Sequence, residues 1–107
     1  MSLHTRPLPM SPETVEALTG LGRAIRDARL ARKLRHEDLA SRAGISVATL
    51  KRLERGDPTL AIGRFLEVLT ALSPSLLADL VGTVRADPTG DALRRKAMGE
   101  RSRREDF

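Results

Sequence analysis

The chain has 107 residues, enough for one small domain with tails, and 40% of them are hydrophobic. It contains no cysteine, which excludes disulfides, thiolate metal sites and cysteine nucleophiles and fits a reducing compartment. Aromatic residues make up 2%, too few for a base-stacking platform for single strands. His4 and His36 are too far apart in sequence to suggest a metal cluster. No apolar run is long enough to span a membrane, and the N-terminus lacks an apolar leader.

The charge is uneven. Lysine and arginine total 19 against 14 acidic residues, a net charge of +5. Residues 21–56 alone hold ten basic and four acidic side chains. A localised basic surface of this kind is typical of nucleic-acid binding, and the alternative is an ordinary solvated helical face.

The chain begins with a segment, residues 1–10, that has two prolines and no periodicity, and we expect a flexible arm there. Ser11 followed by Pro12 is a helix start signal. The apolar residues that follow recur every three or four positions, the spacing of one buried helical face, and predict a helix ending near Lys33: Val15, Leu18, Leu21, Ile25 and Ala28. Gly20 and Gly22 indicate a possible break in its middle.

Two short helices should follow. Glu37 and Asp38 place negative charge in the first turn of one helix, where it suits the helix dipole. Gly44 then occupies a helix-terminating position, and Ser46 is a fresh N-cap for the next helix. Residues 56–59, Gly-Asp-Pro-Thr, read as a stop and turn.

The remaining elements are also helical. Residues 60–72 predict a helix with mostly inward apolar side chains, including Ile62 and Phe65, and Ser73-Pro74 opens a short fifth helix. We therefore expect an all-α bundle of about five helices over residues 11–82. Residues 83–107 should form a polar, disordered tail, with at most one or two helical turns over residues 91–98.

Three residues in the centre of the chain have a demanding spacing. A small residue, Ala40, is followed four positions later by Gly44 and six positions after that by the aliphatic Leu50. A helix–turn–helix needs a small residue where its helices cross, a glycine with positive φ in the turn, and an aliphatic anchor in the second helix. The sequence over residues 36–55 therefore predicts such a motif, against the alternative of an ordinary pair of core helices.

Residues 21–72 resemble the Cro/cI-type (Xre) helix-turn-helix family, with a lambda-repressor-like fold. The resemblance is found in LGRAIRDAR, LRHEDLASRAGIS, TLKRLERGDP and FLEVLTAL. It implies that the second motif helix enters the major groove and that a homodimer reads a palindromic operator in double-stranded DNA. This chain departs from the family where Arg35 and His36 replace the usual Thr and Gln, which implies weaker capping.

The resemblance also implies roles for individual residues. The side chains facing base edges would be Val47, Ala48, Lys51 and Arg52, with Arg52 the best candidate for bidentate reading of guanine. Phosphate contacts would come from Arg35, His36, Arg42, Ser46, Thr49 and Arg55. Arg29 and Glu54 would form an internal bridge between the first helix and the recognition helix. For each surface base, a plain solvated charge is the alternative.

A narrower resemblance is to HipB-type antitoxins, found in Arg55-Gly56-Asp57-Pro58 and in residues 87–93. It implies a repressor that controls its own operon and binds a HipA-like kinase toxin through its tail, where Phe107 is a possible anchor. The alternatives are a stand-alone Xre-type regulator and a protein-interaction adaptor that does not read DNA. We expect no enzyme activity, cofactor, metal or membrane partner, and a cytoplasmic location that becomes nucleoid-associated on DNA binding.

Overall fold

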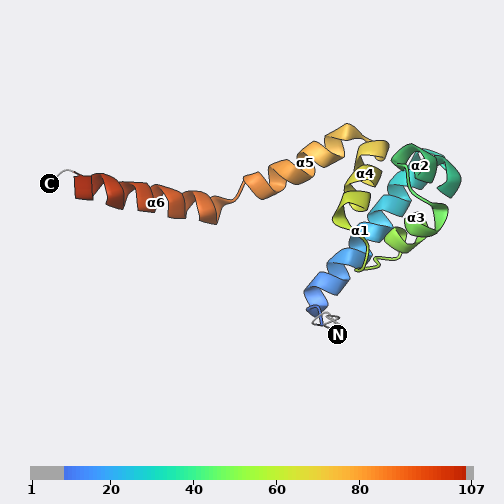
Figure 1. Cartoon of the computed structure of the whole chain (residues 1–107), viewed down its shortest axis with the longest axis horizontal. Coiled ribbons are helices and arrows are strands. Elements are labelled where there is room, and N and C mark those ends of the chain that lie inside the picture. The colour runs from blue at the N-terminus through green and yellow to red at the C-terminus, as the bar shows by residue number, and fades with distance from the viewer. Residues whose placement is uncertain (1–8, 106–107) are drawn as a thin grey trace, which may run out of the picture. The chain divides into compact units, whose positions relative to one another are not determined.

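The computed structural model describes residues 9–105 and is helical throughout, which confirms the all-α prediction. Six helices follow one another in this range (Figure 1): α1 (Pro12–Ala31), α2 (His36–Ala43), α3 (Val47–Glu54), α4 (Ile62–Leu72), α5 (Pro74–Arg85) and α6 (Pro88–Glu105). Five of them begin within residues 11–82, where about five were expected, and α6 lies beyond that range. His4, most of the predicted arm and Phe107 lie outside the described residues.

The chain divides into two compact units, Met1–Pro74 and Ser75–Phe107. The first unit contains α1–α4, and the second contains α6 and all of α5 but its first residue. The domain boundary expected after residue 82 therefore falls inside α5.

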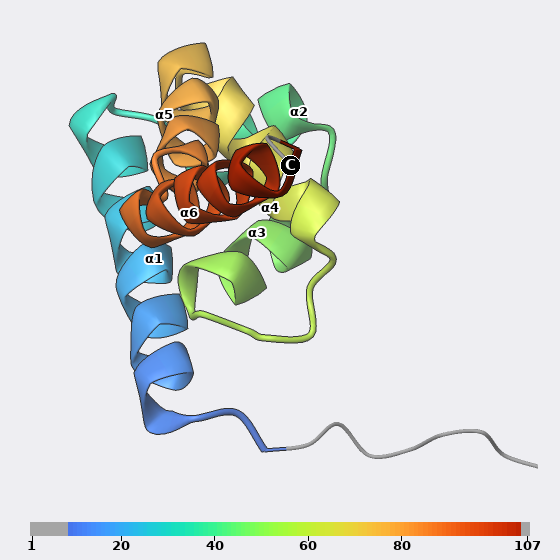
Figure 2. The same ribbon diagram turned by 90° about the vertical axis from the view of Figure 1, so that its left-hand side faces the viewer.

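The core of the first unit is built where α2 packs against α3 and α4, and α1 against α3 and α4 (Figure 2). Leu39 of α2, Leu50 of α3 and Val68 of α4 are fully buried. The other buried apolar side chains are Ile25, Ala40, Ala43, Leu53 and Leu72. Each of the four helices thus contributes at least one side chain to the core, which fixes the motif helices against one another.

Helix α1 is continuous, so the break considered at its glycines does not occur. Gly22 is buried, and a Cβ there would lie 2.4 Å from the carbonyl oxygen of Glu54. This glycine is therefore needed for the close approach of α1 to the end of α3. Val15 and Leu21, expected on the buried face, are 48% and 46% exposed. The start of α1 extends beyond the other helices of the unit (Figure 2), and Leu21 lines an open cavity.

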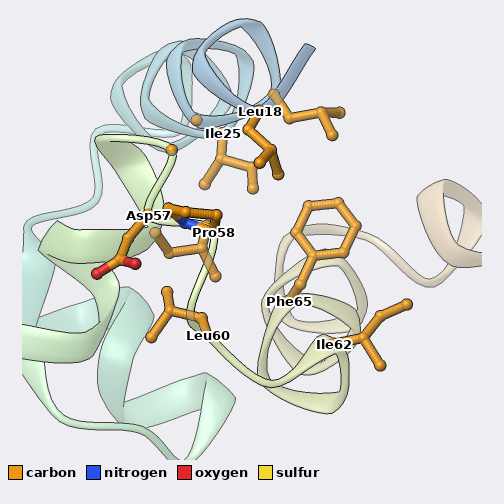
Figure 3. Close-up of a pocket in the computed structure, with 11 residues that line it drawn as sticks. Leu18, Ile25, Asp57, Pro58, Leu60, Ile62 and Phe65 are labelled. Carbon is orange, nitrogen blue, oxygen red and sulfur yellow. The ribbon is translucent and has the colours of Figure 1, made fainter. Parts of the chain in front are cut away.

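An apolar cavity of about 300 Å³ opens between α1, α4 and the loop after α3 (Figure 3). Leu18, Ile25, Leu60 and Phe65 line it, and Ile62 at its rim is 74% exposed. Phe65 is therefore only half-buried, and the expectation that Ile62 points inward is wrong.

The second unit lacks a buried core of the kind found in the first unit, over the residues that the structure describes. Helix α5 has no buried residue, and α6 runs for 18 residues where at most two turns were expected in a disordered tail. At its start, the Asp87 carboxylate accepts the backbone N–H of Gly90 at 3.0 Å, and Pro88 follows as the first helical residue. Most of the other residues of α6 are strong helix formers, which favour a helix even where it has no apolar stripe.

No helix in the described range is long and apolar enough to cross a membrane.

Candidate nucleic-acid interface

The turn between α2 and α3 has the geometry that the motif requires. Gly44 ends α2 in the left-handed conformation, with φ 67° and ψ 32°. Its N–H donates to carbonyls of the last turn of α2, and Ile45 N–H donates to the Ala40 carbonyl at 3.0 Å. Ala40 is 2% exposed at this end of α2, and Leu50 anchors α3 from inside. The predicted small residue, glycine and aliphatic therefore occupy their predicted places.

Helix α3 begins at a capping pair. The Ser46 hydroxyl accepts the Thr49 backbone N–H at 3.0 Å and donates to the Thr49 hydroxyl oxygen at 2.9 Å. This cap satisfies an N–H that the helix itself leaves without a partner. Both residues were predicted to contact phosphate, and they meet at the N-terminus of α3, where the helix dipole also favours an anion.

A buried ion pair joins α1 to the end of α3. Arg29 Nε donates to Glu54 Oε2 at 2.8 Å, and Arg29 Nη2 donates to Glu54 Oε1 at 3.1 Å. The remaining nitrogen, Nη1, donates to the Leu34 carbonyl at 3.0 Å. Both side chains are 5% exposed, so this predicted bridge is shielded from water and acts in the interior. Burial raises the pKa of Glu54, but the hydrogen bonds and charges of Arg29 and His36 outweigh it and hold that pKa below its ordinary value.

His36, the first residue of α2, also reaches this pair. Its Nε2 lies 3.1 Å from Glu54 Oε1, and the imidazole remains 30% exposed. His36 was predicted to contact phosphate, and in the structure one ring nitrogen is occupied by an internal partner. Only Nδ1 is left for a ligand, so any phosphate contact would come through that atom.

Arg35 is the N-cap residue of α2 and forms hydrogen bonds with Asp38 in the first turn of that helix. Asp38 accepts the Arg35 backbone N–H at 2.9 Å and the guanidinium Nε at 3.3 Å. The backbone N–H of Arg35, followed by its side chain, lowers the pKa of Asp38, while Asp38 raises the pKa of Arg35. Asp38 thus compensates in part for the missing Thr cap, and the Arg35 side chain stays 77% exposed at the edge of the motif.

The four residues predicted to read bases lie together on α3. Val47, Ala48, Lys51 and Arg52 are spaced one and four positions apart, which places them on neighbouring positions of one helical face. Ala48 and Lys51 are exposed, and Val47 and Arg52 are partly exposed. Arg42 on α2 and Arg55 after α3, both predicted phosphate contacts, are exposed and form no ion pair with any described residue.

Arg52, the residue favoured for guanine reading, is hydrogen-bonded to the loop that follows α3. Its Nε donates to Asp57 Oδ2 at 2.7 Å and its Nη2 to the Thr59 hydroxyl oxygen at 2.8 Å. Asp57 Oδ1 in turn accepts the Thr59 hydroxyl at 2.7 Å and the Thr59 backbone N–H at 2.8 Å. The two Thr59 bonds and then Arg52 lower the pKa of Asp57 to about 2.

The sequence interpretation missed Asp57 and Thr59, because it used residues 56–59 as a turn and as part of a family resemblance and gave neither side chain a role in the site. An Asp two residues before a Thr is typical of a turn in which the carboxylate accepts a backbone N–H. Arg52 lies five residues before Asp57 and carries the opposite charge. This spacing of the two charges is the sequence signal that would have predicted the cluster.

Within residues 9–105 no group of His, Asp and Glu side chains is arranged to hold a metal ion.

A family model described as "Helix-turn-helix domain" matches residues 20–89, and the chain belongs to this family. One curated relative is 38% identical over 56 residues, a match that covers 52% of this chain and 74% of the relative. It is the "Uncharacterized HTH-type transcriptional regulator y4mF" of Sinorhizobium fredii (strain NBRC 101917 / NGR234). No solved structure matches the chain.

Proposed function

We propose that this protein is a sequence-specific, double-stranded DNA-binding regulator of transcription. The observation that supports this most is the left-handed Gly44 turn, which joins α2 to a capped α3 whose outward face bears Lys51 and Arg52. A helix held in this way fits the major groove. The family match and the name of the relative point to the same class of protein.

In this proposal the interface has two kinds of contact. Lys51 and Arg52 hydrogen-bond base edges, while Val47 and Ala48 offer apolar contact to thymine methyl groups. The positioning contacts to phosphate come from the ends of α2 and α3: Arg35, His36, Arg42, Ser46, Thr49 and Arg55. Because few side chains can hydrogen-bond a base, the shape and stiffness of the DNA supply part of the selectivity.

The test is a salt titration of binding to two duplexes, the region upstream of the protein's own gene and a scrambled control. We expect the upstream region to bind on the order of 10³-fold more tightly, with a steep negative salt slope on both duplexes. Equal binding that vanishes near physiological salt would contradict the proposal and favour a protein-interaction adaptor.

We also propose that the protein acts as a homodimer. Leu80, Val81 and Val84 of α5 are 36%, 42% and 72% exposed, and Leu76 and Leu77 are only partly buried. An apolar stripe of this kind on a helix without a buried residue is suited to a second copy of itself. A twofold-symmetric dimer would bind a palindromic operator and act as a repressor. Analytical ultracentrifugation should give twice the monomer mass for the wild-type protein. The double variant Leu80→Glu, Val84→Glu should sediment with the mass of one monomer.

The finer proposal is an antitoxin that binds a HipA-like kinase toxin and represses its own operon. What supports it is α6, an 18-residue helix whose side chains are almost all exposed and largely charged. Deleting residues 86–107 should leave DNA binding intact and abolish co-purification with a kinase encoded beside this gene. A complex that survives the deletion would contradict this role, and the chain would then be a stand-alone regulator.

A further inference from the structure

The Arg52–Asp57–Thr59 cluster joins the recognition helix to the loop that follows it. A guanidinium offers two pairs of N–H groups for bidentate contact, one pair along the Nε–Nη2 edge and one across the terminal Nη1–Nη2 edge. Asp57 and Thr59 accept from Nε and Nη2 and so occupy the first edge. Nη1 makes no hydrogen bond to any residue that the structure describes, and the side chain is 44% exposed. The terminal edge is therefore the one with a donor left for a ligand.

Several hydrogen bonds also hold the cluster together internally. Asp57 is held by the backbone N–H and the hydroxyl of Thr59, and the Asp57 N–H donates back to the Arg52 carbonyl at 3.1 Å. The carboxylate points away from Leu18, Ile62 and Phe65, the apolar side chains around the cavity on the other side of the loop (Figure 3). An arginine braced at one edge loses less side-chain entropy when its other edge binds a base.

Arg52 differs from the neighbouring basic residues because its charge is neutralised by a carboxylate. Asp57 neutralises the formal charge of Arg52, whereas Lys51, Arg42 and Arg55 form no ion pair with any described residue. A neutralised arginine contributes little to sequence-independent attraction by phosphates, which depends on net charge. Its terminal edge still matches the O6 and N7 acceptors of guanine.

We propose that Asp57 and Thr59 are specificity-determining positioning residues, which present the terminal edge of Arg52 to a guanine and suppress its use as a general phosphate contact. This inference rests on the proposed DNA-binding function. It assigns part of the sequence selectivity to a loop outside the helix-turn-helix itself.

The test uses the full chain, a duplex selected by the wild-type protein from a random pool, and a scrambled duplex. Asp57→Asn keeps the shape of the side chain and removes its charge. We expect it to bind the scrambled duplex more tightly, with a salt slope steeper by about 0.9 per bound chain. The ratio of selected to scrambled affinity should fall by about tenfold or more, the scale of one bidentate base contact.

Two further variants separate positioning from charge. Asp38→Asn is the matched control, because it removes one negative charge beside Arg35 in the same motif. It should raise affinity for both duplexes and change their ratio by less than about threefold. Thr59→Val removes a hydroxyl and no charge, so we expect a lower ratio with an unchanged salt slope. Circular dichroism establishes that each variant is folded.

The outcomes are distinct. If the wild-type protein selects no duplex above the scrambled control, the proposed function fails and this inference fails with it. If the wild-type protein is selective and both Asp57→Asn and Thr59→Val keep its ratio, only the inference is overturned. A fall in the ratio for Thr59→Val alone supports positioning even where Asp57→Asn does not fold.

Discussion

The two units of this chain are stabilised by different physical means. The first unit buries side chains from four helices and encloses the Arg29–Glu54 pair, so its stability depends on contacts between residues distant in sequence. In the second unit α5 has no buried residue, and α6 depends on helix propensity and on pairs three residues apart such as Asp91–Arg94. The comparison shows that identical chemistry, an acid beside an arginine, has different consequences at different burial.

The difference between the buried and the exposed acid–arginine pair can be tested by removing one acid from each unit. Glu54→Gln leaves Arg29 buried without a counter-charge, and we expect the free energy of unfolding to fall by about 3–5 kcal/mol. Asp91→Asn removes an exposed partner of Arg94 and should change it by less than about 0.5 kcal/mol. Urea denaturation followed by circular dichroism measures both. Equal effects of the two substitutions would contradict the distinction.

Glycine substitutions should also act with opposite signs in the two units. A Cβ at Gly22 meets the backbone of Leu53 and Glu54, which cannot move without displacing α3, so Gly22→Ala should destabilise the first unit by about 2 kcal/mol or more. A Cβ at Gly99 in α6 meets nothing within 4 Å, and Gly99→Ala should stabilise that helix by about 1 kcal/mol. Thermal unfolding and the total helix content from circular dichroism measure the effects of both variants. A Gly22→Ala variant as stable as the wild-type protein would show that α1 is not packed against α3.

Acid should unfold the first unit selectively. Because the pKa of Glu54 is below its ordinary value of 4.5 in the folded state, its contribution to stability is present above pH 4.5. That contribution is lost as the pH falls through the folded pKa. An NMR titration of the Glu54 carboxyl should give a midpoint below 4.5, with loss of the α1–α4 signals before those of α6. A midpoint at or above 4.5 would contradict the buried pair.

A smaller effect than that at Gly22 concerns the turns before and after the first motif helix. Lys33 has φ 56° without being glycine, and Gly44 has φ 67° with open space where a Cβ would lie. Lys33→Gly should therefore raise the free energy of unfolding by about 1 kcal/mol, and Gly44→Ala should lower it by a similar amount. Chemical denaturation of the two variants side by side tests the pair, and a destabilised Lys33→Gly would contradict it.

The sequence predicted the motif well because its requirements are local. Gly44 must adopt positive φ, Ala40 must be small, and Leu50 must be apolar, whatever the rest of the chain does. Gly22 was misinterpreted because its role depends on the backbone of α3, which is distant in sequence. The Arg52–Asp57–Thr59 cluster was missed because helix and turn were interpreted as separate elements. Helix α6 was missed because a low apolar content was taken to mean disorder, although propensity alone favours a helix there.

The most direct test of the account is an NMR titration of the full chain with a duplex that it selects. We expect the largest amide shift changes in α3 and at its start, over residues 46–52, with further changes at Asp57 and Thr59 and few in α6. Changes confined to α5 and α6, or absent from α3, would contradict the claim that the helix-turn-helix reads DNA.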